Sequence, residues 1–258
     1  MIAWRGVSKS FDGGATQAVD EVTLEAADGG FLAIVGESGS GKSTLVKMLN
    51  RLVEPDRGEV LVGGEAVGQG PPHALRRRIG YVFQAIGLFP HLSVAENIGV
   101  TPRLLGWPAE RIERRVGRLL DLVRLPQAYA QRRPDALSGG QRQRVGIARA
   151  LAAEPRIVLL DEAFGALDPV TREALASDYR ALHDELALTT VMITHDVLEA
   201  VLLADRMAVM QTGRVLAQGS ARELMGGDAP PYVRELMASP RRQAERVAER
   251  LGLGVLNV

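Results

Sequence analysis

Short apolar segments alternate with longer amphipathic segments along most of the chain. Apolar and polar residues alternate over 2–7 and 19–26, a pattern typical of strands with one buried face, and Gly13-Gly14 between them indicates a turn. Other short apolar runs predict further strands. They lie at 31–35, 59–62, 80–84, 157–160 and 191–194, and the alternation of elements continues through 197–204, 207–210 and 215–217.

Helical periodicity occupies the intervals between these runs. From Ala109 onward, apolar residues recur three and four positions apart, which predicts an amphipathic helix. Two more helices are expected over about 139–153, ending before Pro155, and over about 170–186. A β-rich first part and a βα second part therefore flank a helical insert of about 86–154. We expect an α/β fold with a mainly parallel sheet and helices packed on it.

Composition narrows the class of protein. The chain has 258 residues, 46% of them hydrophobic and 24% charged, which is typical of a folded globular protein. Lys+Arg equals Asp+Glu at 31 each, so we expect no nucleic-acid partner held by bulk charge. Cysteine is absent, which excludes disulfides, zinc fingers and thiol catalysis. No apolar run approaches the roughly 20 residues of a membrane span. We therefore expect a cytoplasmic protein whose membrane role, if it has one, requires a partner.

The best-defined motif follows the predicted strand at 31–35. It reads Gly36-Glu37-Ser38-Gly39-Ser40-Gly41-Lys42-Ser43, followed by Thr44, and matches the phosphate-binding pattern G-x-x-x-x-G-K-[ST]. The glycines let consecutive N–H groups point at phosphate oxygens, and the start of the next helix adds its positive end. Lys42 could reach the β- and γ-phosphates, and Ser43 could ligate Mg²⁺. The alternative, a flexible glycine turn, is disfavoured by the strand–loop–helix context.

A second motif places two carboxylates at the end of a buried strand. Asp161 and Glu162 follow the apolar run 157–160, and this end of the strand lies at the sheet edge where phosphates bind. We expect Asp161 to serve the Mg²⁺ site and Glu162 to polarise an attacking water. Without the phosphate-binding loop, an ordinary solvated strand end would explain these residues equally well.

Two weaker signals complete the set. Ser138, before Gly139-Gly140-Gln141, is a good helix N-cap, and the N–H groups behind it make another anion site, although a simple capped helix explains the residues too. His195-Asp196 follows an apolar strand, where a histidine is commonly structural.

Taken in order, these motifs resemble those of the ATP-binding subunit of an ABC transporter, over about residues 2–238. The resemblance rests on the phosphate-binding loop, Leu137–Gln141, the Asp161-Glu162 strand, Ala166-Leu167-Asp168 and Ile193–Asp196. It implies a P-loop NTPase (RecA-like) core, at about 1–85 and 155–225, with an antiparallel β part and an inserted helical subdomain. It also implies binding and hydrolysis of ATP with Mg²⁺.

The same resemblance implies roles for individual residues. Gln84 touches Mg²⁺ and senses the γ-phosphate, Asp168 belongs to the D-loop, and His195 contacts the γ-phosphate. Phe11 stands where the family places an aromatic residue that stacks on adenine; the alternative is a ring packed on the core. The chain would form a head-to-tail homodimer, in which Ser138, Gly139, Gly140 and Gln141 cover the ATP of the other copy.

Two segments resemble the ATPases of osmoprotectant importers for glycine betaine, carnitine and choline. They are Tyr81–His91 and Asp161–Pro169. Many such ATPases have a second Gln where this chain has Ala85, and many carry C-terminal CBS modules, which we do not expect in the short tail 239–258, read as a helix plus a loose end. Alternatives are an importer of another small solute, an ABC ATPase of DNA repair or translation, and a P-loop kinase or GTPase.

The resemblance also implies partners. They are transmembrane permease subunits and, indirectly, a solute-binding protein, so that the chain would sit on the cytoplasmic face of the membrane. Gln84–His91 contains Gly87 and Pro90 and is expected to be a loop whose apolar residues form part of the groove for the permease. The alternative is that Ile86, Leu88 and Phe89 fill the joint between the core and the helical insert.

Overall fold

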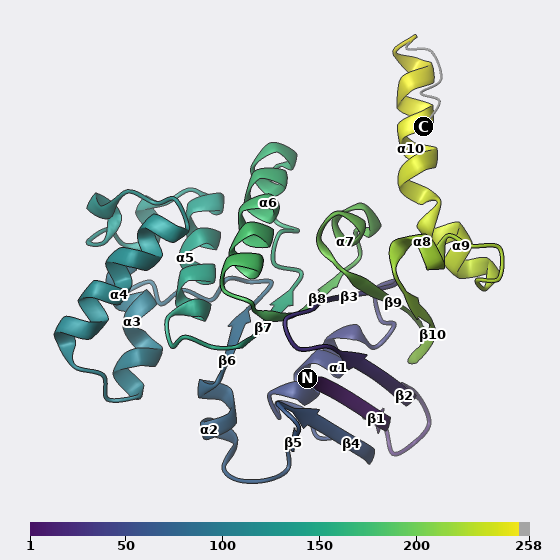
Figure 1. Cartoon of the computed structure of the whole chain (residues 1–258), viewed down its shortest axis with the longest axis horizontal. Helices are drawn as coiled ribbons and strands as arrows, with labels where there is room; N and C mark the ends of the chain where they lie inside the picture. The colour runs from purple at the N-terminus through teal and green to yellow at the C-terminus, as the bar shows by residue number, and fades with distance from the viewer. Residues whose placement is uncertain (253–258) are drawn as a thin grey trace.

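Two β-sheets face one another in the computed structural model, which describes residues 1–252 (Figure 1). The smaller sheet is antiparallel, with strand order β2-β1-β4-β5. Its strands are β1 (Ile2–Ser10), β2 (Gln17–Ala26), β4 (Arg57–Val62) and β5 (Glu65–Ala66). Side chains alternate between exposed and buried over residues 21–26 of β2, as expected where one face of a sheet packs against the rest of the protein.

The larger sheet has the order β10-β9-β3-β8-β7-β6 and is parallel except for β10. Its strands are β3 (Phe31–Val35), β6 (Ile79–Val82), β7 (Ile157–Asp161), β8 (Thr189–Thr194), β9 (Arg206–Gln211) and β10 (Arg214–Gly219). All five residues of β3 are buried, with Phe31, Ala33 and Val35 in one core cluster and Leu32 and Ile34 in another. A central strand covered on both faces explains its continuous apolar run.

Helix α1 (Lys42–Leu49) lies between the two sheets, where it contacts β2, β4, β7 and β8. Leu45, Val46, Met48 and Leu49 are fully buried. The fully buried Trp4 of β1 donates its indole N–H to the Leu45 carbonyl at 3.0 Å. The antiparallel sheet therefore fixes the helix that begins at Lys42.

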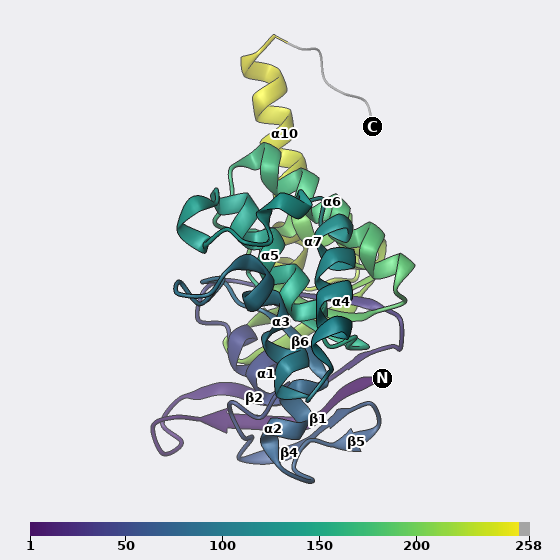
Figure 2. The same cartoon turned by 90° about the vertical axis from the view of Figure 1, so that its left-hand side faces the viewer.

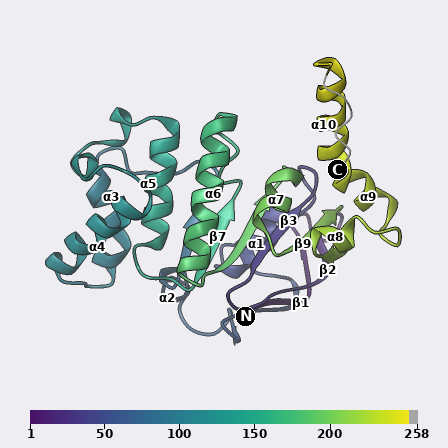
Figure 3. The ribbon, with the colours of Figure 1, turned by 45° about the horizontal axis from the view of Figure 1, so that its top comes forward.

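Most of the remaining helices cover the opposite face of the larger sheet or extend from it, whereas one short helix before β6 lies on the same side as α1 (Figures 1 and 3). Between β6 and β7 the chain forms α3 (Val94–Leu104), α4 (Ala109–Leu122) and α5 (Gly139–Leu151), with short 3₁₀ turns at Gln127–Tyr129 and Pro134–Ala136. These helices form a cluster at one end of the molecule. They are followed by α6 (Pro169–Glu185) and α7 (Val197–Leu203), while α2 (Pro72–Arg77) precedes β6.

The described residues end with three helices, of which the last projects from the body (Figure 2). They are α8 (Ala221–Leu224), α9 (Pro231–Met237) and α10 (Ser239–Arg250). The terminal helix expected in the tail is therefore present, and the loose end expected after it falls largely on 253–258, outside the described residues. Within the described residues, no helix is both long enough and apolar enough to cross a membrane.

The expected fold class is confirmed, and the main differences concern short or interrupted elements. Helix α3 contains Gly99 and Pro102, which hide its periodicity, and α2 has no buried residue to mark it. The strand expected over 80–84 ends at Val82, so that Gln84 lies in the following loop.

Candidate nucleotide-binding site

The loop 36–41 fills a space in which two glycines have no room for a side chain. Gly36 and Gly41 have φ angles of 154° and 101°. A Cβ atom on Gly36 would collide with the backbone oxygen of Met210 in β9, and one on Gly41 with that of Ala18 in β2. The loop is therefore held between strands of both sheets in a conformation open only to glycine.

Lys42 turns its ammonium group back into this loop. Its Nζ donates to the carbonyls of Gly36 and Glu37, both at 2.7 Å, and to the Ser40 hydroxyl at 3.3 Å. Burial lowers the pKa of Lys42, whereas the charges of Glu162 and Glu37 raise it. The cation that would meet a phosphate thus lies near the carboxylate expected to activate water.

Parallel pairing brings the other predicted residues to the same sheet edge. In register, Val35 lies beside Thr194 and Asp161 beside Ile193, so β3, β7 and β8 end together. The residues that follow these strands are the loop at Gly36, then Glu162, then His195. Sequence positions more than 150 residues apart therefore meet where ligands bind in open α/β sheets.

Glu162 is the centre of a small polar cluster. Gln84 donates its Nε2–H to Glu162 Oε2 at 2.8 Å, and His195 Nδ1 lies 3.6 Å from the same oxygen. The backbone of Glu162 is left-handed, with φ of 47°, and its N–H donates to the Ile193 carbonyl at 3.0 Å. A non-glycine residue in this region costs about 1–3 kcal/mol and is found mainly where the surroundings enforce it for function.

Asp161 has a different environment from Glu162. Its Oδ2 accepts a hydrogen bond from the Tyr81 hydroxyl at 2.8 Å. Burial raises the pKa of Asp161, while the Tyr81 hydrogen bond and the charge of Lys47 lower it. Burial also raises the pKa of Tyr81. The phenol therefore stays protonated and donates to the carboxylate.

The donors at this edge fit a magnesium nucleotide. The Ser43 hydroxyl, the Gln84 amide oxygen and the Asp161 carboxylate are hard oxygen ligands of the kind Mg²⁺ prefers. Among the described residues, no group of three or more His, Cys, Asp or Glu side chains forms a metal cage. A set with one carboxylate suits an ion that shares its coordination with water and substrate phosphates.

Ser138 to Gln141 form the start of α5, in the helix cluster between β6 and β7. Ser138 caps α5 by accepting from Gln141 N–H at 3.3 Å, and its own N–H donates to Gln141 Oε1 at 2.9 Å. A Cβ atom on Gly140 would lie 2.6 Å from Thr171 Cγ2, so the helix start packs against α6. Helix α6 and β7 lie between α5 and α1 in Figure 1. Within residues 1–252, no hydrogen bond joins Ser138 to the phosphate-binding loop.

Within residues 1–252, Asp168 and Phe11 form no hydrogen bond with the Glu162 cluster. Asp168 caps α6 by accepting from Thr171 N–H at 3.0 Å, and this hydrogen bond lowers the pKa of Asp168. The Phe11 side chain, which follows β1, is 66% exposed, with Lys9 Nζ 5.6 Å from the ring centre. The alternative that Phe11 packs on the core is therefore wrong.

Two arginines that the sequence analysis missed hold the loops around this edge. Arg149 of α5 donates to the carbonyls of Ile86 and Gly87, each at 2.6 Å. Arg172 of α6 donates to the carbonyls of Gly165 and Leu167, at 3.2 and 3.0 Å, and lies 3.6 Å from Asp196. Arginines in helices usually indicate a solvated face, so no sequence signal distinguished these two.

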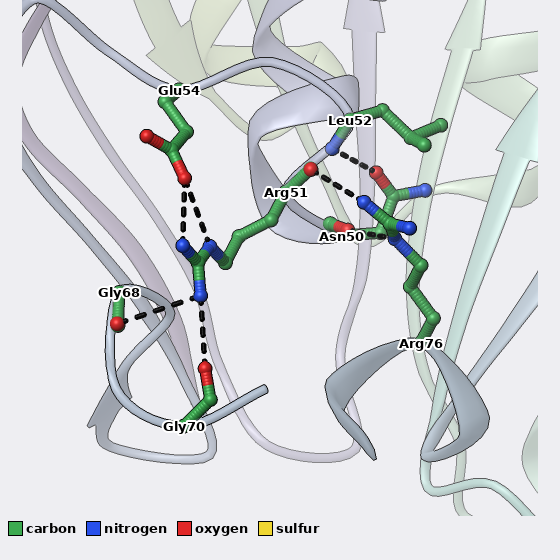
Figure 4. A network of polar contacts seen from close by, with 7 residues as sticks. All are labelled: Asn50, Arg51, Leu52, Glu54, Gly68, Gly70 and Arg76. Carbon is green, nitrogen blue, oxygen red and sulfur yellow. Dashed lines mark hydrogen bonds and ion pairs between the residues drawn. The ribbon is translucent and has the colours of Figure 1, made fainter. Parts of the chain in front are cut away.

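A cavity of about 230 Å³ lies between the end of α1, helices α2, α3 and α5, and strand β6 of the larger sheet. Its lining includes Leu52, Arg76, Phe83, Arg149 and Ala153. Figure 4 shows how one wall is built. Arg76 donates from Nε to the Asn50 carbonyl at 2.9 Å and from Nη2 to the Arg51 carbonyl at 2.7 Å, at the end of α1.

Arg51 fixes the same wall from the other side (Figure 4). Its guanidinium donates to Glu54 Oε1 at 2.7 Å and to the Gly70 carbonyl at 3.0 Å. Together, Arg51 and Arg76 join α1, which begins in the phosphate-binding loop, to α2 and the chain before it.

Substitution of Gly41 tests the packing of the phosphate-binding loop. Gly14 serves as the control, because its φ of 102° is close to the 101° of Gly41. Nothing lies within 4 Å of the position that a Cβ atom on Gly14 would take. Gly14→Ala should therefore cost only the left-handed strain, about 1 kcal/mol. Gly41→Ala adds a backbone collision and should cost about 3 kcal/mol in the free energy of unfolding, measured with urea. Equal losses in the two variants would contradict the packing described above.

Comparison with known proteins supports a single family. The family model described as "ABC transporter" matches residues 19–165. The choline transport ATP-binding protein OpuBA of Bacillus subtilis is 44% identical over 93% of this chain and 63% of its own length. The glycine betaine uptake system ATP-binding protein YehX of Escherichia coli is 48% identical over 91% of this chain and 76% of its own. The chain thus spans less than two thirds of the Bacillus protein.

Solved structures agree with these matches. CbiO1 from Clostridium perfringens, part of the ABC transporter complex cbiONQ, superposes with a TM-score of 0.82 at 26% identity, covering 97% of this chain and 98% of that chain. The dimeric ATP-binding cassette MJ0796, bound to ADP and Pi, superposes with a TM-score of 0.76 at 32% identity, covering 85% of this chain and 98% of that chain. With the loop, strand ends and capped helix already described, these matches show that the chain belongs to the ABC transporter ATP-binding family.

Proposed function

We propose that this chain is the ATP-hydrolysing motor subunit of an ABC importer. The observation that carries the proposal is the meeting of Lys42, Gln84 and Glu162 at one sheet edge, with Asp161 beside them. Residues 36–44 would bind the phosphates of ATP, and Phe11 would stack on adenine. Ser43, Gln84 and Asp161 would hold Mg²⁺, which supplies charge neutralisation at the phosphates when bound.

Glu162 is the residue best placed to activate water. Its Oε2 accepts a hydrogen bond from Gln84 and lies 3.6 Å from His195 Nδ1, so that both neighbours can orient the carboxylate. Asp161 is half-buried and paired to Tyr81, which leaves it suited to metal binding rather than proton transfer. The two adjacent carboxylates would thus have different roles, with Asp161 as a metal ligand and Glu162 as the general base.

The same geometry favours a second copy of the chain. Ser138 and its neighbours form the capped start of α5, a helix that α6 separates from α1 in Figure 1. A head-to-tail dimer would bring Ser138–Gln141 and Asp168 of each copy to the ATP of the other, and symmetry would give two shared sites. The dimeric state of MJ0796 supports this arrangement.

We also propose the membrane partner and the class of solute. The cavity beside Phe83, with the loop 84–91, would receive a permease helix at the cytoplasmic face, and a solute-binding protein would deliver the solute. The names of the relatives OpuBA and YehX favour quaternary ammonium osmoprotectants such as choline and glycine betaine. Sulfate/thiosulfate import ATP-binding protein CysA of Thermosynechococcus vestitus, 46% identical over 90% of this chain and 68% of its own length, supports the alternative of another small solute.

The domain organisation stays part of this proposal. Residues 1–238 would form one ATPase domain, with its core at about 1–85 and 155–225. The helical cluster within 86–154 would move relative to that core when ATP binds and leaves. Its motion would then reach the permease through the loop that Arg149 holds.

Glu162→Gln tests the assignment of the base. Loss of the proton acceptor should reduce ATP turnover by about 10²–10⁴-fold, because positioned general-base catalysis is worth that much. Binding of a fluorescent ATP analogue should be retained. The control is Glu96→Gln, in which glutamine can keep the capping box that Glu96 forms with Ser93. Turnover of Glu162→Gln at the wild-type rate would exclude Glu162 as the base.

Phe89→Asp tests the partner surface. Phe89 is 42% exposed, whereas Leu88 packs against the core, so Phe89 can be changed with less risk to folding. A buried unpaired carboxylate costs far more than the roughly 1.4 kcal/mol that corresponds to tenfold binding, so co-purification with the permease should fall at least tenfold. ATP hydrolysis by the isolated chain should remain. Leu202→Asp on α7, where Leu202 is 66% exposed, is the control. Normal assembly of Phe89→Asp would contradict the proposed surface.

A further inference from the structure

A chain of two aromatic rings joins the cavity at Phe83 to the carboxylate of Asp161. Phe83 is 42% exposed and lines the cavity. Its ring stacks on that of Tyr81, with centroids 4.1 Å apart and planes inclined by 30°. The hydroxyl of Tyr81 donates to Asp161 Oδ2 at 2.8 Å. One side chain, Tyr81, therefore contacts both the cavity wall and the metal-binding edge.

The strand register explains why Tyr81 reaches Asp161. Tyr81 of β6 lies beside Leu159 of β7. Leu159 and Asp161 are two positions apart on one strand, so their side chains leave the sheet on the same face. The length of the phenol then spans the step from the level of Leu159 to that of Asp161. A shorter side chain at position 81 would leave the carboxylate without this donor.

We propose that Tyr81 is a positioning residue that orients Asp161 for the metal ion, with Phe83 holding the ring of Tyr81 in place. The proposal rests on the proposed function, in which Asp161 is a ligand of the nucleotide-bound Mg²⁺. Carboxylate ligands that are themselves hydrogen-bonded bind metal in a fixed orientation, and loss of such a partner typically costs 10–100-fold in metal affinity. The carboxylate of Asp161 has two oxygens. Tyr81 donates to Oδ2, which leaves Oδ1 free for the metal.

The test measures metal binding rather than turnover. Mn²⁺ replaces Mg²⁺, and free Mn²⁺ is followed by electron paramagnetic resonance in the presence of a non-hydrolysable ATP analogue. The variant is Tyr81→Phe, which keeps the stacked ring and removes the hydroxyl. The control is Tyr179→Phe, because the hydroxyl of the fully buried Tyr179 likewise makes one side-chain hydrogen bond, with Thr190 Oγ1 at 3.0 Å. Asp161→Asn reports on the ligand itself, and nucleotide affinity in EDTA reports on the phosphate-binding loop.

Tyr81→Phe should raise the Mn²⁺ dissociation constant by about 10–100-fold and leave the affinity for nucleotide in EDTA unchanged. Tyr179→Phe should change neither quantity. Wild-type Mn²⁺ affinity in Tyr81→Phe, together with a loss in Asp161→Asn, would overturn the role of Tyr81 while leaving the proposed function intact. Wild-type Mn²⁺ affinity in Asp161→Asn would overturn the metal assignment in the proposed function and this inference with it.

Discussion

The structure depends on how closely the backbone of both sheets approaches the phosphate-binding loop. The carbonyl oxygens of Ala18 and Met210, one from each sheet, occupy the space beside Gly41 and Gly36. Helix α1 starts from this point and is fixed further along by Trp4 and by Arg76. The conformation of the loop is therefore fixed by packing against both sheets.

The loops that complete the site are held by arginine side chains in addition to apolar packing, which includes the fully buried Phe164. Arg149 binds two successive carbonyls after Gln84, and Arg172 binds two carbonyls before Asp168. Among the described residues, Arg149 forms no ion pair with a carboxylate, and burial lowers the pKa of its guanidinium. Because α5 carries Ser138 at its start and Arg149 near its end, one rigid helix joins the proposed dimer surface to the loop beside the cavity.

The sequence predicted those parts of the site that depend on local pattern. The run Phe31–Val35 and the run before Asp161 are continuously apolar because both strands are covered on two faces, and each leads into a recognisable motif. Contacts between residues far apart in the chain produce no pattern in the local sequence. Tyr81 reads as an ordinary strand residue, yet its hydroxyl meets a carboxylate 80 positions away. Helix α3 escaped detection because Gly99 and Pro102 interrupt its periodicity, although tertiary packing keeps it helical.

The central claim is that each chain carries two half-sites that are completed only by a second copy. Sedimentation velocity of Glu162→Gln protein, in which hydrolysis would not reopen the interface, tests it most directly. The account predicts dimers with ATP and Mg²⁺, monomers with ADP, and monomers in both nucleotides when Ser138→Arg is added. Monomers in ATP and Mg²⁺ at all protein concentrations, or dimers that tolerate Ser138→Arg, would contradict it.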